Sequence, residues 1–368
     1  MRRSAVISGT GSAFPARRVT NAELASTVST SDEWVRSHLG ICERRVASLA
    51  DGETTTSLAV AAGRSALAAA GVDPGSLDLI VVATATPDRR APAVACAVQA
   101  ALGAQPAAAF DLAAVCSGFL YGLSVVTAMI EAGRAQRVLL IGADTFSTIT
   151  DWTDRQCVFF GDGAGAAVIE AGRVDHGLLS IELYADGAGA DGFTVPSVGP
   201  FVMDGGAVYD AATSVLPDAI EGALAAAGVR PDDVDLVIPH QPSVRILQEI
   251  AARTGIPFSR FVTTMDRYAN TAGASVGVTL DHAVRTGRLH DGDIVVFAAV
   301  GSGWTWGAAV FRWSTAPRSS PPASVHGTSR PGETSRAQNV AGIVRAPSAA
   351  LSAATVGAAG GRSEGIGP

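Results

Sequence analysis

ALAAAGV occurs at residues 66–72 and again at residues 223–229, and both copies close a segment rich in alanine. Each copy is followed by a turn that contains proline and then by a short apolar run: DPGSLDLIVVATATP at 73–87 and RPDDVDLVIPHQPS at 230–243. Alanine-rich segments of this kind favour helices, whereas a short β-branched run after a turn is typical of a buried strand. The chain is therefore predicted to build the same helix, turn and strand twice.

Further pairs of similar segments follow in the same order. The strand-like runs pair as RVLLIGAD (137–144) with DIVVFAAV (293–300), and GAGAAVIE (163–170) with TWGAAVFRW (305–313). Repetition in a constant order, at a period near half the core, indicates two related α/β halves rather than a solenoid. Alternating helices and strands favour sheets that are covered by helices. The predicted halves are residues 1–172 and 173–313.

After Trp313 the composition changes to serine, proline, alanine and glycine, with almost no large apolar residue. A segment of this composition cannot bury enough apolar surface to offset the entropy lost on ordering. Residues 314–368 are therefore predicted to form a disordered tail.

The composition also limits the classes of partner. Of the 368 residues 48% are hydrophobic, but no apolar run is long enough to cross a bilayer and no export signal is recognised at the amino terminus. These features predict a globular protein of the cytoplasm without membrane contact. The formal net charge of −7 argues against a nucleic-acid surface, which needs clustered lysine and arginine. The cysteines and histidines show no metal-ligand spacing, so no metal is expected.

Cys116 is the candidate nucleophile. It lies in FDLAAVCSGFL, where a strand-like run meets a helix rich in small residues, so the thiol is predicted at a helix amino terminus. Backbone N–H groups and the helix dipole favour a thiolate there, and the thiolate is the species that attacks a thioester. The alternative is that Cys116 is only a small core residue. Cys42, Cys96 and Cys157 have no comparable context and are interpreted as structural.

His240 and Asn270 are the candidate polar partners of the thiol. His240 follows the predicted strand DLVIP directly, at the strand end where ligands gather in α/β folds. Asn270 lies in RYANTAGAS, the counterpart of the Cys116 region in the second half, although an asparagine there could equally cap a helix. The glycine loop GSGWTWG at 301–307 matches no phosphate-binding fingerprint, and we expect it to aim N–H donors at a developing oxyanion.

Taken together, these segments resemble the β-ketoacyl-acyl-carrier-protein synthase III family of the thiolase superfamily, over residues 4–313. The resemblance is carried by rare words in a fixed order: GTGSAFP, TSDEWV, AAVCSGF, FGDGAGAAV, PHQPSVRI, YANTAGAS and GSGWTWG. It implies a five-layer αβαβα thiolase fold and a homodimer. It also implies that Cys116, His240 and Asn270 form a catalytic triad, with the backbone N–H groups of Cys116 and Ser302 as oxyanion donors.

The activity implied by the resemblance is a two-step acyl transfer without a cofactor, because coenzyme A enters only as the thioester substrate. Cys116 would take an acyl group from acyl-CoA. His240 and Asn270 would then assist decarboxylation of malonyl-acyl carrier protein, whose enolate attacks the acyl-enzyme. The resemblance also assigns coenzyme A and carrier contacts, to Trp34, Arg155, Tyr209, Ser243 and Arg245. For these residues the alternative is an ordinary surface aromatic or a salt-bridging arginine.

Several residues depart from the family pattern. His38 replaces a second coenzyme-binding arginine, Ser243 replaces a frequent asparagine, and Asp210 stands where a basic residue commonly docks the carrier. Ser302 replaces the middle glycine of a GGG word, although its backbone N–H is kept. Ala91 aligns with a bulky phenylalanine near the acyl pocket and suggests room for a larger primer. These departures suggest a secondary-metabolite branch of the family.

Two other functions remain open from the sequence. The first is an acyl shuttle, in which the same cysteine passes the acyl group to a hydroxyl, an amine or a carrier without forming a carbon–carbon bond. The second is an inactive partner that only shapes a heterodimer. The presence of Cys116, His240 and Asn270 together argues against the inactive partner, and Asn270 favours condensation over the shuttle.

Overall fold

The computed structural model describes residues 4–172 and 176–314. The first of its two main sheets has five strands in the order β1-β7-β6-β4-β5. Strand β4 is parallel to β5 and β6, whereas β7 runs antiparallel to both β6 and β1. The strand bounds are Ser4–Ala13 (β1), Leu79–Ala83 (β4), Ala108–Leu112 (β5), Arg137–Asp144 (β6) and Gly163–Gly172 (β7).

The second sheet has four strands in the order β11-β12-β13-β8. Strand β11 is parallel to β12, and β13 runs antiparallel to its two neighbours. The strand bounds are Gly177–Ala185 (β8), Leu236–Pro239 (β11), Ile294–Gly301 (β12) and Thr305–Arg312 (β13). Both sheets therefore combine parallel strands with antiparallel ones.

The two copies of ALAAAGV end the two helices that precede β4 and β11. Helix α3 spans Thr55–Ala70 and helix α6 spans Gly205–Ala227. Gly71 and Gly228 follow them in the left-handed conformation, with φ of 58° and 67°. A residue with a Cβ is strained in that conformation, so glycine ends each helix and turns the chain toward the next strand.

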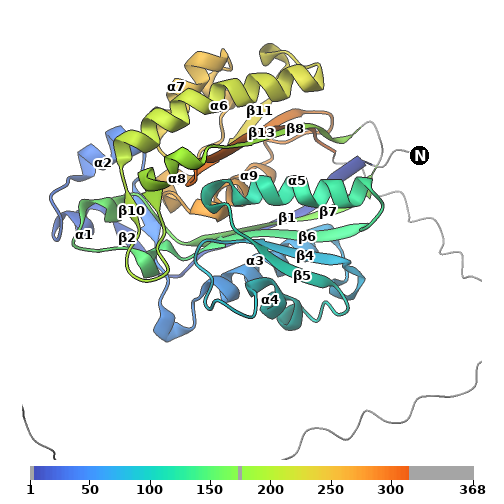
Figure 1. Ribbon diagram of the computed structural model, residues 1–368, viewed down its shortest axis with the longest axis horizontal. Coiled ribbons are helices and arrows are strands. Elements are labelled where there is room, and N and C mark those ends of the chain that lie inside the picture. The colour runs from blue at the N-terminus through green and yellow to red at the C-terminus, as the bar shows by residue number, and fades with distance from the viewer. Residues whose placement is uncertain (1–3, 173–175, 315–368) are drawn as a thin grey trace, which may run out of the picture. The chain divides into compact units, whose positions relative to one another are not determined.

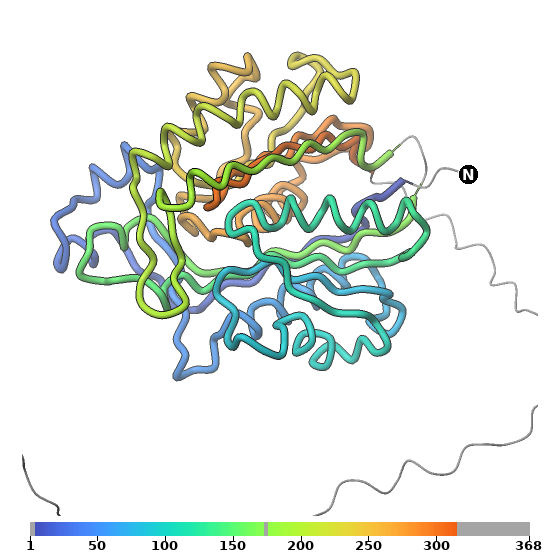
Figure 2. The backbone as a smooth tube through the Cα atoms, viewed as in Figure 1, coloured from blue at the N-terminus to red at the C-terminus, as the bar shows by residue number. Residues whose placement is uncertain are grey.

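The helices form three layers around the two sheets, as Figures 1 and 2 show. Helices α3 and α4 (Val94–Leu102) cover the outer face of the first sheet, and α6 and α7 (Val244–Thr254) cover the outer face of the second. Helices α5 (Gly118–Glu131) and α9 (Ser275–Arg285) lie between the sheets, and their apolar side chains share one buried cluster with strands of both. The predicted αβαβα layering is thus present.

Short elements lie outside these layers. They are β2 Arg18–Thr20, α1 Asn21–Ala25, α2 Asp32–Leu39, β3 Glu43–Arg45, β9 Phe193–Thr194, β10 Val202–Met203 and α8 Met265–Tyr268. Within the described part of the chain, no helix combines the length and apolar character needed to cross a membrane.

The first sheet is drawn from residues 4–172 and the second from residues 177–312. We retain as a proposal that the chain consists of two duplicated halves, 1–172 and 173–313. The disordered tail expected at 314–368 lies, apart from its first residue, outside the described residues.

Candidate active site

Cys116 lies in the short connection between β5 and α5. Residues Val115–Ser117 form a 3-10 turn, and α5 begins at Gly118. The preceding Val115 has φ of 44°, an unfavourable conformation for a β-branched residue, and Cys116 is only 2% exposed. As predicted, the thiol lies directly before the amino terminus of a helix.

His240 and Asn270 reach the same place from the second half of the chain. His240 follows β11 and its N–H donates to the Ala298 carbonyl at 2.8 Å. Asn270 pairs with the first half through Phe159, whose carbonyl accepts from the Asn270 N–H at 3.1 Å. Its side-chain Oδ1 accepts the Ala272 N–H at 2.8 Å, which leaves the amide NH2 group as a donor.

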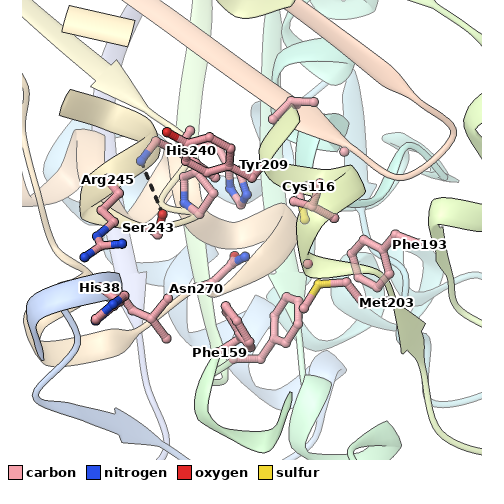
Figure 3. A pocket seen from close by; sticks show the side chains of 18 of the residues that line it. His38, Cys116, Phe159, Phe193, Met203, Tyr209, His240, Ser243, Arg245 and Asn270 are labelled. Carbon is pink, nitrogen blue, oxygen red and sulfur yellow. Dashed lines mark hydrogen bonds between the residues drawn. The ribbon is translucent and has the colours of Figure 1, made fainter. Parts of the chain in front are cut away.

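One cavity of about 230 Å³ brings the three side chains together. Cys116, His240 and Asn270 all line it, and Figure 3 shows them around the same space. The other lining side chains are mostly apolar, and they include Phe159, Phe160, Phe193, Met203, Val208, Ile246, Val300 and Trp304. A thiol, an imidazole and an amide donor therefore meet in a cavity whose wall is mostly apolar.

Burial controls the protonation of the thiol and the imidazole. It lowers the pKa of His240 to about 3, so the imidazole is neutral at physiological pH. Its Nδ1 has no hydrogen-bond partner among the described residues, which suits a neutral ring that carries its proton on Nε2. Burial, followed by the charge of Asp144, raises the pKa of Cys116. Burial therefore favours the thiol form of Cys116, against the thiolate that the helix terminus alone would favour.

The turn after β12 lies against the backbone of Cys116. A Cβ added to Gly301 would sit 3.0 Å from the Cys116 nitrogen and 2.9 Å from the Ser117 nitrogen, so only glycine allows this approach. Ser117 Oγ and Thr305 Oγ1 are hydrogen-bonded at 2.6 Å and join the two segments again. Ser302, the next residue of the turn, is thus held near the thiol, although its side chain does not line the cavity.

The residues expected to hold coenzyme A gather at the α2 and α7 side of the cavity. Trp34, Tyr209, Ser243 and Arg245 line it, and the Arg155 guanidinium lies 3.9 Å from the centre of the Trp34 ring. Ser243 also caps α7, since its Oγ accepts the Ile246 N–H at 3.3 Å. These contacts supply an aromatic surface with cations beside it.

His38 and Asp210 mark two of the departures noted in the sequence. The His38 ring stacks on Trp34 with 4.7 Å between the ring centres, and it lines the cavity. Asp210 lies one residue beyond Tyr209 in α6 and does not line the cavity.

Comparison with known proteins assigns this arrangement to a family. A family model for 3-oxoacyl-[acyl-carrier-protein] synthase III matches residues 110–187, and a second model, for the C-terminal part of the same family, matches residues 224–313. The β-ketoacyl-[acyl-carrier-protein] synthase III of Rhizorhabdus wittichii is 50% identical over 322 residues, which cover 85% of this chain and 100% of that protein. The chain belongs to the β-ketoacyl-[acyl-carrier-protein] synthase III family. The resemblance expected from the sequence and the condensing acyltransferase class are thereby confirmed.

Solved structures agree with this assignment. The synthase III from Aquifex aeolicus superposes with a TM-score of 0.82 at 40% identity, covering 84% of this chain and 100% of that one. The priming β-ketosynthase of the R1128 polyketide pathway superposes with a TM-score of 0.80 at 33% identity, covering 85% and 97% of the two chains. The thiolase-like fold is confirmed, while assignment to a secondary-metabolite branch stays a prediction.

In the structure of this synthase, Ala91 does not line the cavity. Ala91 is exposed in the segment between β4 and α4 and is not among the lining residues, so its assignment to an acyl pocket stays a prediction. Phe193, Met203 and Val208 do line the cavity, and the sequence analysis did not single them out. They come from the short strands β9 and β10 and from the first turn of α6, which carry no recognisable motif.

Asp144 is a second residue that the sequence analysis missed. It ends β6, is fully buried, and its Oδ1 accepts the N–H groups of Ala85 at 2.8 Å and Thr86 at 3.1 Å. The hydroxyls of Thr84 and Thr86 donate to the same oxygen, and the Gly273 N–H donates to Oδ2 at 2.8 Å. Burial raises the pKa of Asp144 to about 6 against these hydrogen bonds. The carboxyl group joins the segment after β4 to the turn after Asn270.

The described residues contain no cluster of three or more histidine, cysteine, aspartate or glutamate side chains that would hold a metal ion.

Proposed function

We propose that this synthase loads an acyl group from acyl-CoA onto Cys116 and condenses it with malonyl-acyl carrier protein to give a β-ketoacyl thioester, in the priming of fatty-acid synthesis. The observation that carries the proposal is that Cys116, a neutral His240 and the Asn270 amide line one largely apolar cavity. Each group has a chemical task in one of the two steps.

In the first step, the sulfur of Cys116 attacks the thioester carbonyl of acyl-CoA. The new C–S bond forms as the C–S bond to coenzyme A breaks, and the proton of the Cys116 thiol leaves with the coenzyme A thiol. The N–H groups of Cys116 and Ser302 would donate hydrogen bonds to the carbonyl oxygen and stabilise the negative charge that develops on it. A donor of this kind contributes about 2.7–4 kcal/mol in comparable sites.

In the second step, the malonyl thioester loses CO2 and the electron pair of the broken C–C bond forms an enolate. His240 Nε2–H and the Asn270 NH2 group would donate hydrogen bonds to the enolate oxygen, and neither needs to change its protonation. The enolate carbon attacks the acyl-enzyme carbonyl, a C–C bond forms, and the Cys116 sulfur leaves and regains a proton. A low pKa of His240 suits this role, because the ring remains a neutral donor.

We assign coenzyme A to the α2 and α7 side of the cavity, with the carrier protein following the same route. The adenine would stack on Trp34, with Arg155 and Arg245 beside the phosphates. Tyr209 and Ser243 would contact the pantetheine arm. We also propose that the synthase works in the cytoplasm, where its proposed substrates are found.

We further propose a homodimer that forms along β5. This strand is the edge of the first sheet, and Ala108 and Phe110 on it are exposed. An exposed edge is a template for pairing with a second chain. Asp111 of β5 accepts the Val94 and Ala95 N–H groups at the start of α4, which brings the segment containing Ala91 near this edge. Ala91 would then face the partner, where it can border the partner's acyl pocket.

Intact-protein mass spectrometry tests the proposed function. The protein is exposed to a panel of acyl-CoAs and then to malonyl-acyl carrier protein, with Cys116→Ala as the loss variant and Cys157→Ala as the matched control. We expect an acyl adduct in the wild type and in Cys157→Ala but not in Cys116→Ala, and its discharge with release of CO2. Equal labelling of the two variants would refute the nucleophile, and discharge only to a hydroxyl, amine or carrier would favour the acyl shuttle.

A further inference from the structure

The segment from Asp186 to Met203, here named the roof segment, connects β8 to α6. It contains the 3-10 turn Gly187–Gly192 and the two short strands β9 and β10, which pair with each other. Phe193 and Met203 point from it into the cavity that contains Cys116, as Figure 3 shows. The roof segment therefore forms part of the wall that faces an acyl group on the thiol.

The roof segment rests on the turn after β12. The Asp186 N–H donates to the Trp304 carbonyl at 2.8 Å. Gly189 and Gly192 pack against the Trp304 indole so closely that an added Cβ would lie within 2.0 Å and 2.6 Å of its ring atoms. The turn that borders Cys116 thus also supports the wall of the cavity.

Ser302 contacts the roof segment directly at Phe193. Its Oγ donates a hydrogen bond to the Phe193 carbonyl, a contact that the glycine commonly found at this family position cannot make. Elsewhere the roof segment is held through other elements, since the Phe201 N–H donates to Ile149 and Gln156 Nε2 donates to the Met203 carbonyl. Because β9 has only two residues, its own pairing gives Phe193 little support.

Phe193 belongs to a group of aromatic rings behind the thiol. Its ring centre lies 5.8 Å from Phe160, 5.9 Å from Phe201 and 6.3 Å from Phe146. All four rings are buried and share a cluster with Cys116. Of the four rings, Phe160 and Phe193 line the cavity together with Cys116, so the position of Phe193 affects the space beside the thiol.

We propose that Ser302 is a positioning residue for acyl-chain selectivity: through its hydroxyl it fixes Phe193 against the cavity and restricts the primer to short acyl groups. The inference rests on the proposed function, because it concerns the acyl group on Cys116. Ser302 would then have two tasks. Its N–H is assigned to the carbonyl oxygen of the acyl group, and its hydroxyl would hold Phe193 at the far end of the acyl chain.

Acylation rates of matched variants test this inference. We would measure kcat/KM for acetyl-CoA and octanoyl-CoA in the wild type, Ser302→Ala, Ser302→Thr, Phe193→Ala and the double variant of Ser302→Ala with Phe193→Ala. Loss of one hydrogen bond predicts that Ser302→Ala raises the octanoyl-to-acetyl ratio about five-fold. Ser302→Thr keeps a hydroxyl and should return the ratio toward that of the wild type. The double variant should match Phe193→Ala, because both changes act through one ring.

Hydrogen exchange of residues 186–203 gives a readout that does not depend on turnover, and it should speed up in Ser302→Ala but not in Ser302→Thr. Three results would overturn this inference and leave the proposed function standing. They are an unchanged octanoyl-to-acetyl ratio in Ser302→Ala, unchanged hydrogen exchange of residues 186–203 in that variant, and an effect of Ser302→Ala that adds fully to that of Phe193→Ala. A wild type that forms no adduct with any acyl-CoA would overturn the proposed function, and the selectivity inference with it.

Discussion

Replacing Asp144 by asparagine should impair condensation while making Cys116 easier to alkylate. The two oxygens of Asp144 have different partners: Oδ1 accepts four hydrogen bonds from the segment after β4, and Oδ2 accepts the Gly273 N–H. Asparagine keeps only one acceptor oxygen. In its better orientation it retains the four bonds to Oδ1 and turns its NH2 group toward the Gly273 N–H.

The size of the effect follows from that buried, unpaired N–H. A donor left without a partner costs about 1–3 kcal/mol, which corresponds to roughly 5-fold to 150-fold in a rate that depends on the geometry. The cost falls on the turn that begins at Asn270, whose Oδ1 is itself held by the Ala272 N–H. We therefore expect a decrease of this size in the condensation rate and a smaller change in acylation by acyl-CoA.

The charge of Asp144 acts in the opposite direction on the thiol. Burial is the largest cause of the raised pKa of Cys116, and the charge of Asp144 is the second. A neutral asparagine at position 144 should therefore lower the pKa of Cys116. Alkylation of Cys116 by iodoacetamide should therefore be faster in Asp144→Asn at a fixed pH, with its pH profile moved to lower pH. Loss of folding alone would not produce faster alkylation of Cys116 together with retained acylation.

Asp162→Asn is the matched control. Asp162 is also buried, burial raises its pKa to about 6, and its carboxyl group accepts from Ser147 and Ala47 rather than from the turn after Asn270. Thermal melts of both variants verify folding, and single-turnover assays separate the two steps. If Asp144→Asn and Asp162→Asn lose both steps equally, or if alkylation of Asp144→Asn slows, the assigned role of Asp144 is wrong.

Three further results are expected. In Asp144→Asn, which lacks the carboxyl group whose pKa is about 6, the condensation rate should show no inflection near pH 6.5, the ordinary pKa of histidine, because burial lowers the pKa of His240 to about 3. A pH–rate profile of single-turnover condensation by this variant that bends there would contradict the low pKa of His240. Trp34→Ala should raise KM for acyl-CoA about ten-fold in steady-state assays, because the variant loses a surface on which the adenine can stack. Iodoacetamide alkylation of Cys116 should change little, because the substitution lies away from the thiol. An unchanged KM would show that Trp34 is not part of the coenzyme A site. The pKa of Asp162 rises from 3.8 to about 6 on folding, so the folded state favours the protonated carboxyl group. The free energy of unfolding should therefore fall by up to about 3 kcal/mol as the pH rises from below 4 to above 6. Urea unfolding at a series of pH values should show a flatter pH dependence for Asp162→Asn than for the wild type.

Much of the fold could be predicted because the deciding signals are local and occur twice. Each copy of ALAAAGV contains the end of a helix and the glycine that stops it, and each is followed by a strand that is buried along its whole length. Cys116 and His240 could be selected because each follows a strand-like run, where side chains meet at one edge of a sheet. The order of the strands within each sheet is set by long-range pairing and was not predicted from these signals.

The remaining parts of the site depend on contacts between distant segments. RVLLIGAD indicates a buried strand and gives no reason to select its last residue, yet Asp144 meets Gly273 far along the chain. Phe193 lies in the two-residue strand β9 of the roof segment, which contacts Trp304 and Ser302 far along the chain. The protonation of Cys116 was likewise hidden, because the helix terminus is visible in the sequence whereas desolvation by surrounding segments is not.

The middle layer has a consequence for how this protein is made. Strand β1 pairs with β7, and helix α5, which follows the nucleophile, packs against β12 and β13, the last strands of the described chain. A nascent chain that has emerged only as far as β7 therefore carries an apolar face of α5 with nothing to cover it. Such surfaces promote aggregation, so ribosome pausing or early termination before β13 should yield insoluble product, and a chaperone that holds the growing chain should raise the yield of active enzyme.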